Sequence, residues 1–213
     1  MKFLILAFFI FSMITFKTSI SFSKTYSLQD VAATLESTYK QPFKNNHNLE
    51  LKINLNQEEP LYFGGANLNN GVFEINVGAD ILTLPAMTTD AATLILCHEL
   101  GHLLSGGAKK PNSTWASTEG QSDYFAATDC APKIFSQMAD SPTTPMSARI
   151  IAAGQALIEA IYIFMDVPQM PRPSISRREA LTEPGTSVNY PTLQCRLDTF
   201  VDGAKGIAAP LCW

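Results

Sequence analysis

The sequence predicts a helix-rich α+β domain with one small antiparallel sheet. Its 213 residues suit a single domain, and 46% hydrophobic against 16% charged residues is typical of a globular chain. Several segments carry apolar residues at helical spacing, whereas two short segments alternate between apolar and polar residues as strands do. The formal net charge of −4 offers no basic surface for nucleic acid, so no nucleic-acid partner is expected.

The first 23 residues have the pattern of a secretory signal peptide. A basic start is followed by an apolar run over residues 3–16, and then by small and polar residues. An uncleaved anchor is the alternative, but a membrane span needs about 20 apolar residues and this run is shorter. We therefore expect residues 1–23 to be removed, leaving one exported domain over residues 24–213, periplasmic or secreted. Membrane contact is expected only through an uncleaved leader.

Four cysteines in an exported chain allow two disulfides in three connectivities. The four are Cys97, Cys130, Cys195 and Cys212. A bond between Cys195 and Cys212 would fix the C-terminus, and one between Cys97 and Cys130 would join two predicted helices. A buried free thiol at Cys97 is the alternative.

The domain begins with a predicted helix over residues 27–39, which has Ser27 as its N-cap and apolar residues on one face. Residues 50–55 and 72–77 alternate and are predicted strands. The sequence Asn69-Asn70-Gly71 is a strong hairpin signal, so the second strand is expected to return antiparallel.

Helices are predicted for most of the remaining chain. One should start with Thr89 or Asp90 as its N-cap and end before the glycine pair at 106–107. The next should start at Ser117 or Thr118 and cover EGQSDYFAATDC.

The C-terminal third is expected to contain two more helices. Residues 147–165 are mostly apolar, and Arg149 and Glu159 inside them favour a core helix over a membrane span. Residues 167–191 carry five prolines and are expected to form a loop, which residues 193–201 follow as a last short helix.

The most informative segment is His98-Glu99-Leu100-Gly101-His102, an H-E-x-x-H motif. Positions i and i+4 share one face of a helix, so both imidazoles can reach one zinc ion. Glu99 is then placed to take a proton from the zinc-bound water, whose pKa falls to about 7. A chance match in an unrelated helix is the alternative. The preceding apolar run and the glycine stop after the motif favour one bound zinc per chain.

A catalytic zinc needs a third protein ligand and one open position. Besides the motif, the only histidine is His47, in an upstream polar loop. The metzincin pattern is excluded because it needs glycine and histidine where this chain has Ser105 and Ala108. Glu119, 17 residues after His102, is the better ligand. A solvated carboxylate in a first helical turn is the alternative.

Asp123 lies four residues after Glu119, on the same helical face. A carboxylate at this place can accept the second ring N–H of a zinc-bound histidine. An ordinary surface residue is the alternative for Asp123.

The combination H-E-L-G-H with E-G-Q-S-D resembles the gluzincin metallopeptidases, in particular the M48 family with its HtpX-like and Ste24-like members. This resemblance implies a zincin-like domain, a zinc cofactor, and a peptide or protein substrate. It implies His98, His102 and Glu119 as zinc ligands, Glu99 as the catalytic base, and Asp123 as the residue that orients a ligand.

Two further segments are similar to parts of that family. Residues 72–78 resemble a strand on whose edge the family binds substrate as an added strand, which implies substrate contacts at Phe73, Glu74, Ile75 and Asn76.

Residues 190–197 are similar to the family segment H-P-x-x-x-x-R-x-x-L, with Arg196 at the arginine position and Tyr190 in place of histidine. If Tyr190 faces the cleft, its hydroxyl could stabilise an oxyanion; a packed aromatic ring is the alternative. The multiple membrane helices of some family members are missing, so a compact soluble relative is expected.

The sequence thus predicts a zinc-dependent endopeptidase that works through a metal-activated water. A non-catalytic, zinc-stabilised binding or chaperone module of the cell envelope is a second possibility, although a structural site does not need Glu99. A zinc hydrolase for a non-peptide amide is a third.

Overall fold

The computed structural model describes residues 26–138, 144–180 and 190–213. The predicted leader, residues 1–23, lies outside the described residues. The helices are α1 (Leu28–Pro42), α2 (Thr89–Leu104), α3 (Glu119–Phe125), α4 (Ala131–Met138), α5 (Met146–Met165) and α6 (Leu193–Ala204). The strands are β1 (Glu50–Asn56), β2 (Gly65–Asn69) and β3 (Val72–Gly78). The predicted helix-rich α+β class is confirmed.

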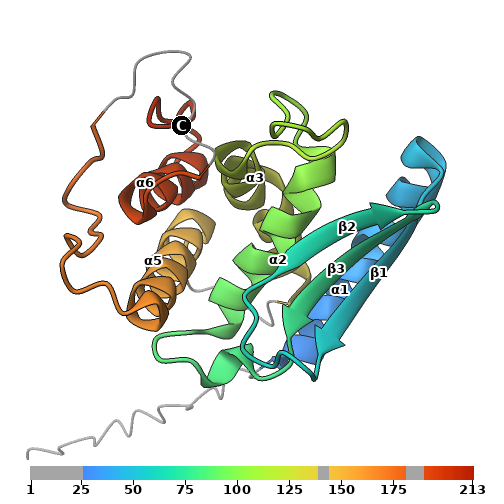
Figure 1. Cartoon of the computed structure of the whole chain (residues 1–213), viewed down its shortest axis with the longest axis horizontal. Coiled ribbons are helices and arrows are strands. Elements are labelled where there is room, and N and C mark those ends of the chain that lie inside the picture. Colours follow the sequence, from blue (N-terminus) through green and yellow to red (C-terminus); the bar gives the residue numbers. More distant parts are fainter. Residues whose placement is uncertain (1–25, 139–143, 181–189) are drawn as a thin grey trace, which may run out of the picture.

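Helix α2 lies at the centre of the molecule, with the sheet and α1 on one side of it and α5 and α6 on the other (Figure 1). Every residue from Ala91 to His102 is buried, because the sheet and the helices α1, α3, α4 and α5 pack around α2. Its N-cap is Thr88, whose hydroxyl accepts from the backbone N–H of Ala91 at 3.1 Å. The predicted cap at Thr89 or Asp90 is therefore wrong by one or two residues, and Asp90 instead pairs with an arginine of α5.

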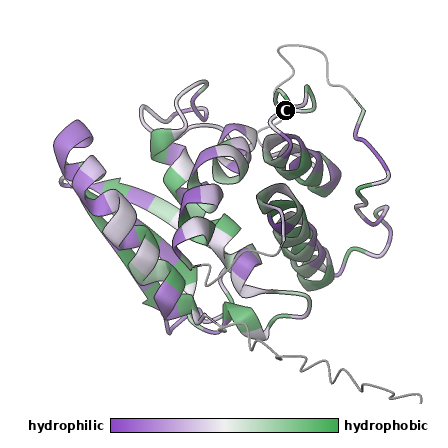
Figure 2. Ribbon diagram, turned by 180° about the vertical axis from the view of Figure 1, so that it is seen from behind, coloured by the Kyte–Doolittle hydropathy of each residue, from purple (hydrophilic) through white to green (hydrophobic). Residues whose placement is uncertain are grey.

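Helix α1 begins with the predicted cap. The Ser27 hydroxyl accepts from the Asp30 N–H, and the Asp30 carboxylate accepts from the Ser27 N–H at 2.8 Å, which completes a capping box. The buried face of α1 includes Val31 and Leu35 and packs against β1. A π-helical turn, η1 (Phe43–His47), then leads into the sheet and is strongly hydrophilic at its exposed end (Figure 2).

The sheet is mixed rather than antiparallel, so that part of the fold prediction is wrong. Its strand order is β1-β3-β2, with β1 parallel to β3 and β2 antiparallel to β3. The predicted hairpin turn does form at Asn70-Gly71, but it joins β3 to β2 instead of to β1. The sequence of β2, GANLN, is small and polar, so it lacks the alternation that identifies a strand.

The prediction that β3 is an edge strand is also wrong. It is the central strand, so both of its edges already pair with neighbours. Phe73 and Ile75 point into the core and are fully buried, whereas Glu74 and Asn76 lie on the opposite, partly exposed face. The edges of the described sheet are β1 and β2, and β2 is the edge strand that contacts α2.

Two disulfides link segments of the helical half, and of the three connectivities that the sequence left open the structure has Cys97–Cys130 with Cys195–Cys212. Cys97 of α2 is bonded to Cys130 in η3 (Ala126–Cys130), the π-helical turn after α3. Cys195 of α6 is bonded to Cys212 near the C-terminus. The first bond links the helix that carries the H-E-x-x-H motif to the segment that carries Glu119 and Asp123.

Helix α5 is, in the described part of the chain, the one helix long and apolar enough to cross a membrane. Ile150, Ala153 and Leu157 on it are buried, and it packs against both α2 and α6. The buried face of α5 is therefore part of the core, whereas Ile163, Phe164 and Met165 at its C-terminal end are exposed. Residues 167–180, the longer described part of the predicted proline-rich loop, contain neither helix nor strand.

Candidate metal centre

The site lies where α2 and α3 come into close contact. Gly101, inside the H-E-x-x-H motif, permits that contact, because a Cβ at this position would lie 2.8 Å from the Cα of Ser122. A real side chain would push the two backbones apart. The absence of a side chain at Gly101 therefore brings the first turn of α3 alongside the two histidines of α2.

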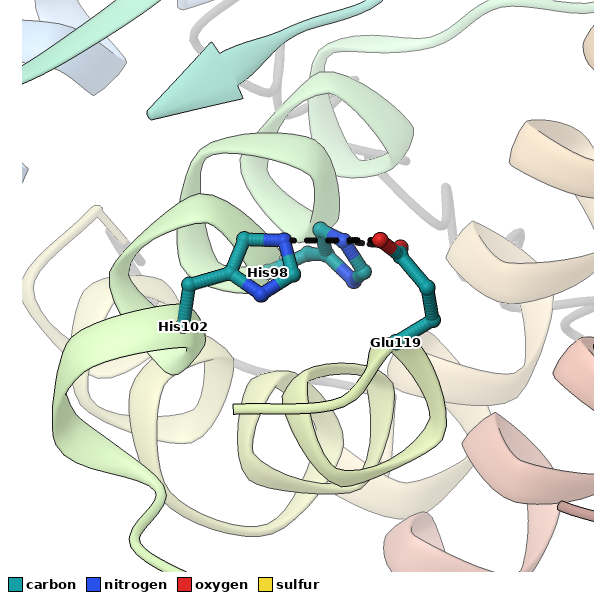
Figure 3. Close-up of side chains that lie close together, drawn as sticks. All are labelled: His98, His102 and Glu119. Carbon is teal, nitrogen blue, oxygen red and sulfur yellow. Dashed lines mark ion pairs between the residues drawn. The ribbon is translucent and has the colours of Figure 1, made fainter. Parts of the chain in front are cut away.

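Three buried side chains converge at this contact: His98, His102 and Glu119, whose potential ligand atoms all lie within 4.8 Å of one another. The Nε2 atom of His98 lies 3.0 Å from Oε2 of Glu119, and Nε2 of His102 lies 3.9 Å from Oε1. Figure 3 shows both imidazoles of α2 facing the carboxylate from α3. This group could hold a metal ion.

The chemistry of the donors fits a divalent ion of the zinc type. Zinc accepts imidazole nitrogen and carboxylate oxygen as ligands, and three protein ligands are the usual number in a catalytic site. In both histidines the Nδ1 atom contacts an oxygen of the protein, so Nε2 is the atom left to face an ion. The third histidine, His47, is exposed in η1 and takes no part in the group.

A buried chain of contacts fixes the orientation of His98. Its Nδ1 atom lies 2.7 Å from Oδ1 of Asp123. Asp123 in turn accepts two hydrogen bonds from Arg196 of α6, both of 2.7 Å. A bidentate arginine–carboxylate pair is geometrically specific, so α6 controls the position of a side chain on α2 through a residue of α3.

His102 is held differently. Its Nδ1 atom lies 2.9 Å from the backbone carbonyl oxygen of Ser117 and 2.9 Å from the hydroxyl of Ser122. Sequence reasoning missed both contacts. A backbone carbonyl leaves no signal in a sequence, whereas Ser122 could have been suspected because it lies three residues after Glu119, on the same face of α3.

Glu99 lies beside the three grouped residues without belonging to them. Its carboxylate is 3.9 Å from Nε2 of His102. Burial raises the pKa of Glu99, and the negative charge of Glu119 raises it further. The positive charge of His98 acts in the opposite direction but does not cancel the rise. Gly64 passes directly over the carboxylate, since a Cβ at Gly64 would lie 3.0 Å from Oε1 of Glu99.

The ionisation of the group is strongly coupled. Burial on its own lowers the pKa of His98, but Asp123 and Glu119 outweigh it and raise that pKa to about 9. Burial, together with the positive charges of His98 and Lys110, lowers the pKa of His102 to about 3. Burial opposes ionisation of Glu119, yet hydrogen bonds and charges from His98 and Lys110 bring its pKa well below the ordinary value. A metal ion would therefore displace a proton held between His98 and Glu119, because a ligating imidazole is neutral.

An open cleft gives access to the group, and Tyr190 lies on its wall, as do Gly65 and Ala66 of the edge strand β2. Tyr190 is 61% exposed, and the Arg196 guanidinium carbon lies 5.6 Å from the centre of its ring. The other residues that line the cleft are Tyr62, Gly64, His98, Glu99, His102, Lys110, Pro111, Ser113, Trp115, Ala116 and Glu119. Residues 73–76, predicted to bind substrate, do not line it.

No family model matches this chain, and no curated protein and no solved structure matches it either.

Proposed function

We propose that this protein is a zinc-dependent endopeptidase. The observation that carries the proposal is the grouping of two imidazoles and one carboxylate at the floor of an open cleft, with a further buried carboxylate, Glu99, beside them. The order of these residues supports a gluzincin peptidase related to the M48 family, and the Arg196–Asp123 contact links the motif to the similar C-terminal segment.

The proposed ligands are His98, His102 and Glu119. Zinc, when bound, would polarise the scissile carbonyl group and lower the pKa of a water molecule at the open position. Glu99 takes a proton from the attacking water and passes it to the leaving amine. Burial moves the pKa of Glu99 upward, which is the direction that favours a carboxylate that must both accept and release a proton.

An open site also distinguishes this proposal from a purely structural zinc site, which normally has four protein ligands and no access. Within the described residues, the group contains three potential ligands, and the cleft reaches all of them. A zinc-stabilised binding or chaperone module would have no need of a buried carboxylate next to the ligands. Glu99 therefore favours the catalytic proposal over the binding one.

The substrate would bind along β2 rather than β3. Among the described strands β2 pairs only with β3, and its first residues, Gly65 and Ala66, line the cleft. An extended peptide could add to the free edge of β2 through main-chain hydrogen bonds. Tyr190 lies on the cleft wall, where its hydroxyl could donate to the oxyanion that forms on the peptide carbonyl.

The two disulfides are compatible with an oxidising compartment. Together with the leader-like N-terminal sequence, they support a periplasmic or secreted location, where the enzyme would meet exported peptides or proteins.

The test is a comparison of wild type with Glu99→Gln, in which both zinc content and peptide hydrolysis are measured. We expect one zinc per chain in both proteins and a loss of hydrolysis of about 10²–10⁴-fold in the variant, the range for general acid–base catalysis. Glu36→Gln, which changes a partly exposed carboxylate on α1, serves as the matched control and should behave as wild type. Stoichiometric zinc without any peptide cleavage by wild type would favour the binding module, and cleavage of non-peptide amides alone would favour the third possibility.

A further inference from the structure

Lys110 places a positive charge directly against the candidate metal ligands. It lies in the loop between α2 and α3, and its Nζ atom is 2.5 Å from Oε1 of Glu119 and 3.3 Å from Nε2 of His102. Two of the three groups that could hold a metal ion are therefore already in contact with a cation from the protein itself. Neither the motif nor its spacing indicates this contact.

The backbone at this point is fixed, whereas the lysine side chain has room to move. The Lys110 N–H donates to the carbonyl of Ala116 at 2.8 Å, and the neighbouring Lys109 forms a β-bridge with Ser117. The side chain of Lys110 is 34% exposed, against 6% for Glu119, and it lines the open cleft. Rotation about the four side-chain bonds can thus carry the ammonium group out into the cleft without unfolding the loop.

A metal ion and this ammonium group cannot share the same contacts. Zinc approaches imidazole nitrogen and carboxylate oxygen to about 2.0–2.2 Å. An ammonium group has three donors and no acceptor, so it cannot itself serve as a ligand. Held against both His102 and Glu119, it would lie within a few ångströms of a doubly charged ion, and the two cations would repel each other.

We propose that Lys110 is an internal competitor of the metal: its ammonium group must leave Glu119 and His102 before the ion can bind, and it swings into the cleft when the ion does so. The metal affinity of the site is therefore lower than its three ligands would give on their own. This inference rests on the metal site of the proposed function, but not on catalysis.

The first test measures zinc affinity of protein stripped with a chelator, by calorimetric titration in the presence of a competing chelator. Lys110→Met keeps most of the alkyl chain and removes the charge, and we expect it to bind zinc about tenfold more tightly, equivalent to one charge-assisted hydrogen bond. Lys110→Arg keeps the charge and should stay near wild type. Lys52→Met, on β1, removes an equal charge far from the ligands and should also stay near wild type.

Unchanged or weakened zinc binding by Lys110→Met would overturn the proposal, since a lysine that merely organises the ligands would lower the affinity when removed. If wild type and all variants fail to bind zinc, both the metal site of the proposed function and the role of Lys110 as a competitor are refuted. If wild type and Lys110→Met bind zinc equally tightly, the role of Lys110 as a competitor is refuted and the metal site stands.

The second test needs no variant. Wild-type protein is acetylated with a lysine-specific reagent, with and without zinc, and the labelling of Lys110 and Lys109 is followed by mass spectrometry. We expect zinc to accelerate the labelling of Lys110, because its ammonium group is released from Glu119, while Lys109, which contacts the Trp115 carbonyl and the Ser117 hydroxyl, labels at a constant rate. Equal rates for Lys110 in the two states would contradict the displacement.

Discussion

Replacing Arg196 by methionine removes the outermost link of the chain that positions His98. The guanidinium group donates two hydrogen bonds of 2.7 Å to Asp123, and the two side chains are only 7% and 0% exposed. Although burial alone would raise the pKa of Asp123, the positive charges of Arg196 and His98 bring it below the ordinary value, so the carboxylate is ionised. Methionine leaves that buried carboxylate without its main counter-charge.

The size of the effect follows from the burial of the pair. Removing one partner of a buried ion pair lowers the free energy of unfolding by about 3–5 kcal/mol. The pair of Arg149 with Asp90 has the same two-bond geometry at 2.7 Å, but its side chains are 23% and 31% exposed. Solvent screens a pair of that kind. Arg149→Met should therefore lower the free energy of unfolding by only about 1–2 kcal/mol, a figure that includes the loss of the arginine's contact with an aromatic ring.

The assay is urea unfolding followed by circular dichroism, with wild type and both arginine variants free of metal. If the free energy of unfolding falls with urea concentration at the same slope in all three proteins, the midpoints of their unfolding curves can be compared as stabilities. Arg196→Met should also weaken zinc binding by about 10–100-fold, the usual effect of losing a group that orients a ligand. Equal losses of stability in Arg196→Met and Arg149→Met would refute the reasoning, because they would show that burial does not set the strength of the Asp123 pair.

Three further changes test other parts of the structure. The double substitution Cys97→Ala with Cys130→Ala opens a loop of 33 residues and should lower the free energy of unfolding by about 4 kcal/mol, measured by thermal unfolding; a loss below about 1 kcal/mol would contradict this. Gly101→Ala places a Cβ 2.8 Å from the Cα of Ser122, so it should lose about 1–3 kcal/mol of stability and weaken zinc binding, and unchanged zinc affinity would mean that α3 can shift freely. Tyr190→Phe should lower kcat by about 10²–10³-fold with little change in KM if its hydroxyl stabilises the oxyanion, and a change in KM alone would assign it to substrate binding.

Local patterns were sufficient to predict the helix that carries the motif. His98 and His102 lie one turn apart, so their shared direction follows from helix geometry. The spacing of Glu119 and Asp123 could be used in the same way because both lie on one helix, α3, one turn apart. The cap of α1 at Ser27 is also local, and it forms as predicted.

The features that the sequence did not predict depend on contacts between distant segments. The order of the sheet is set by which strand pairs with β3 on each side, and β2 gave no alternating pattern to suggest that it was a strand at all. Arg196 meets Asp123 across 73 residues of chain, and no spacing rule connects them. Lys110 reaches the ligands only because the loop between α2 and α3 folds back over them.

The central claim is that one metal ion, held by His98, His102 and Glu119, makes this protein a peptidase. The most direct test is to strip the protein of metal and to measure peptide hydrolysis while zinc is added back in steps. The account predicts no hydrolysis by the stripped protein, a linear rise up to one zinc per chain, and no recovery in Glu119→Gln. Hydrolysis that survives complete removal of metal, or that recovers fully in Glu119→Gln, would contradict it.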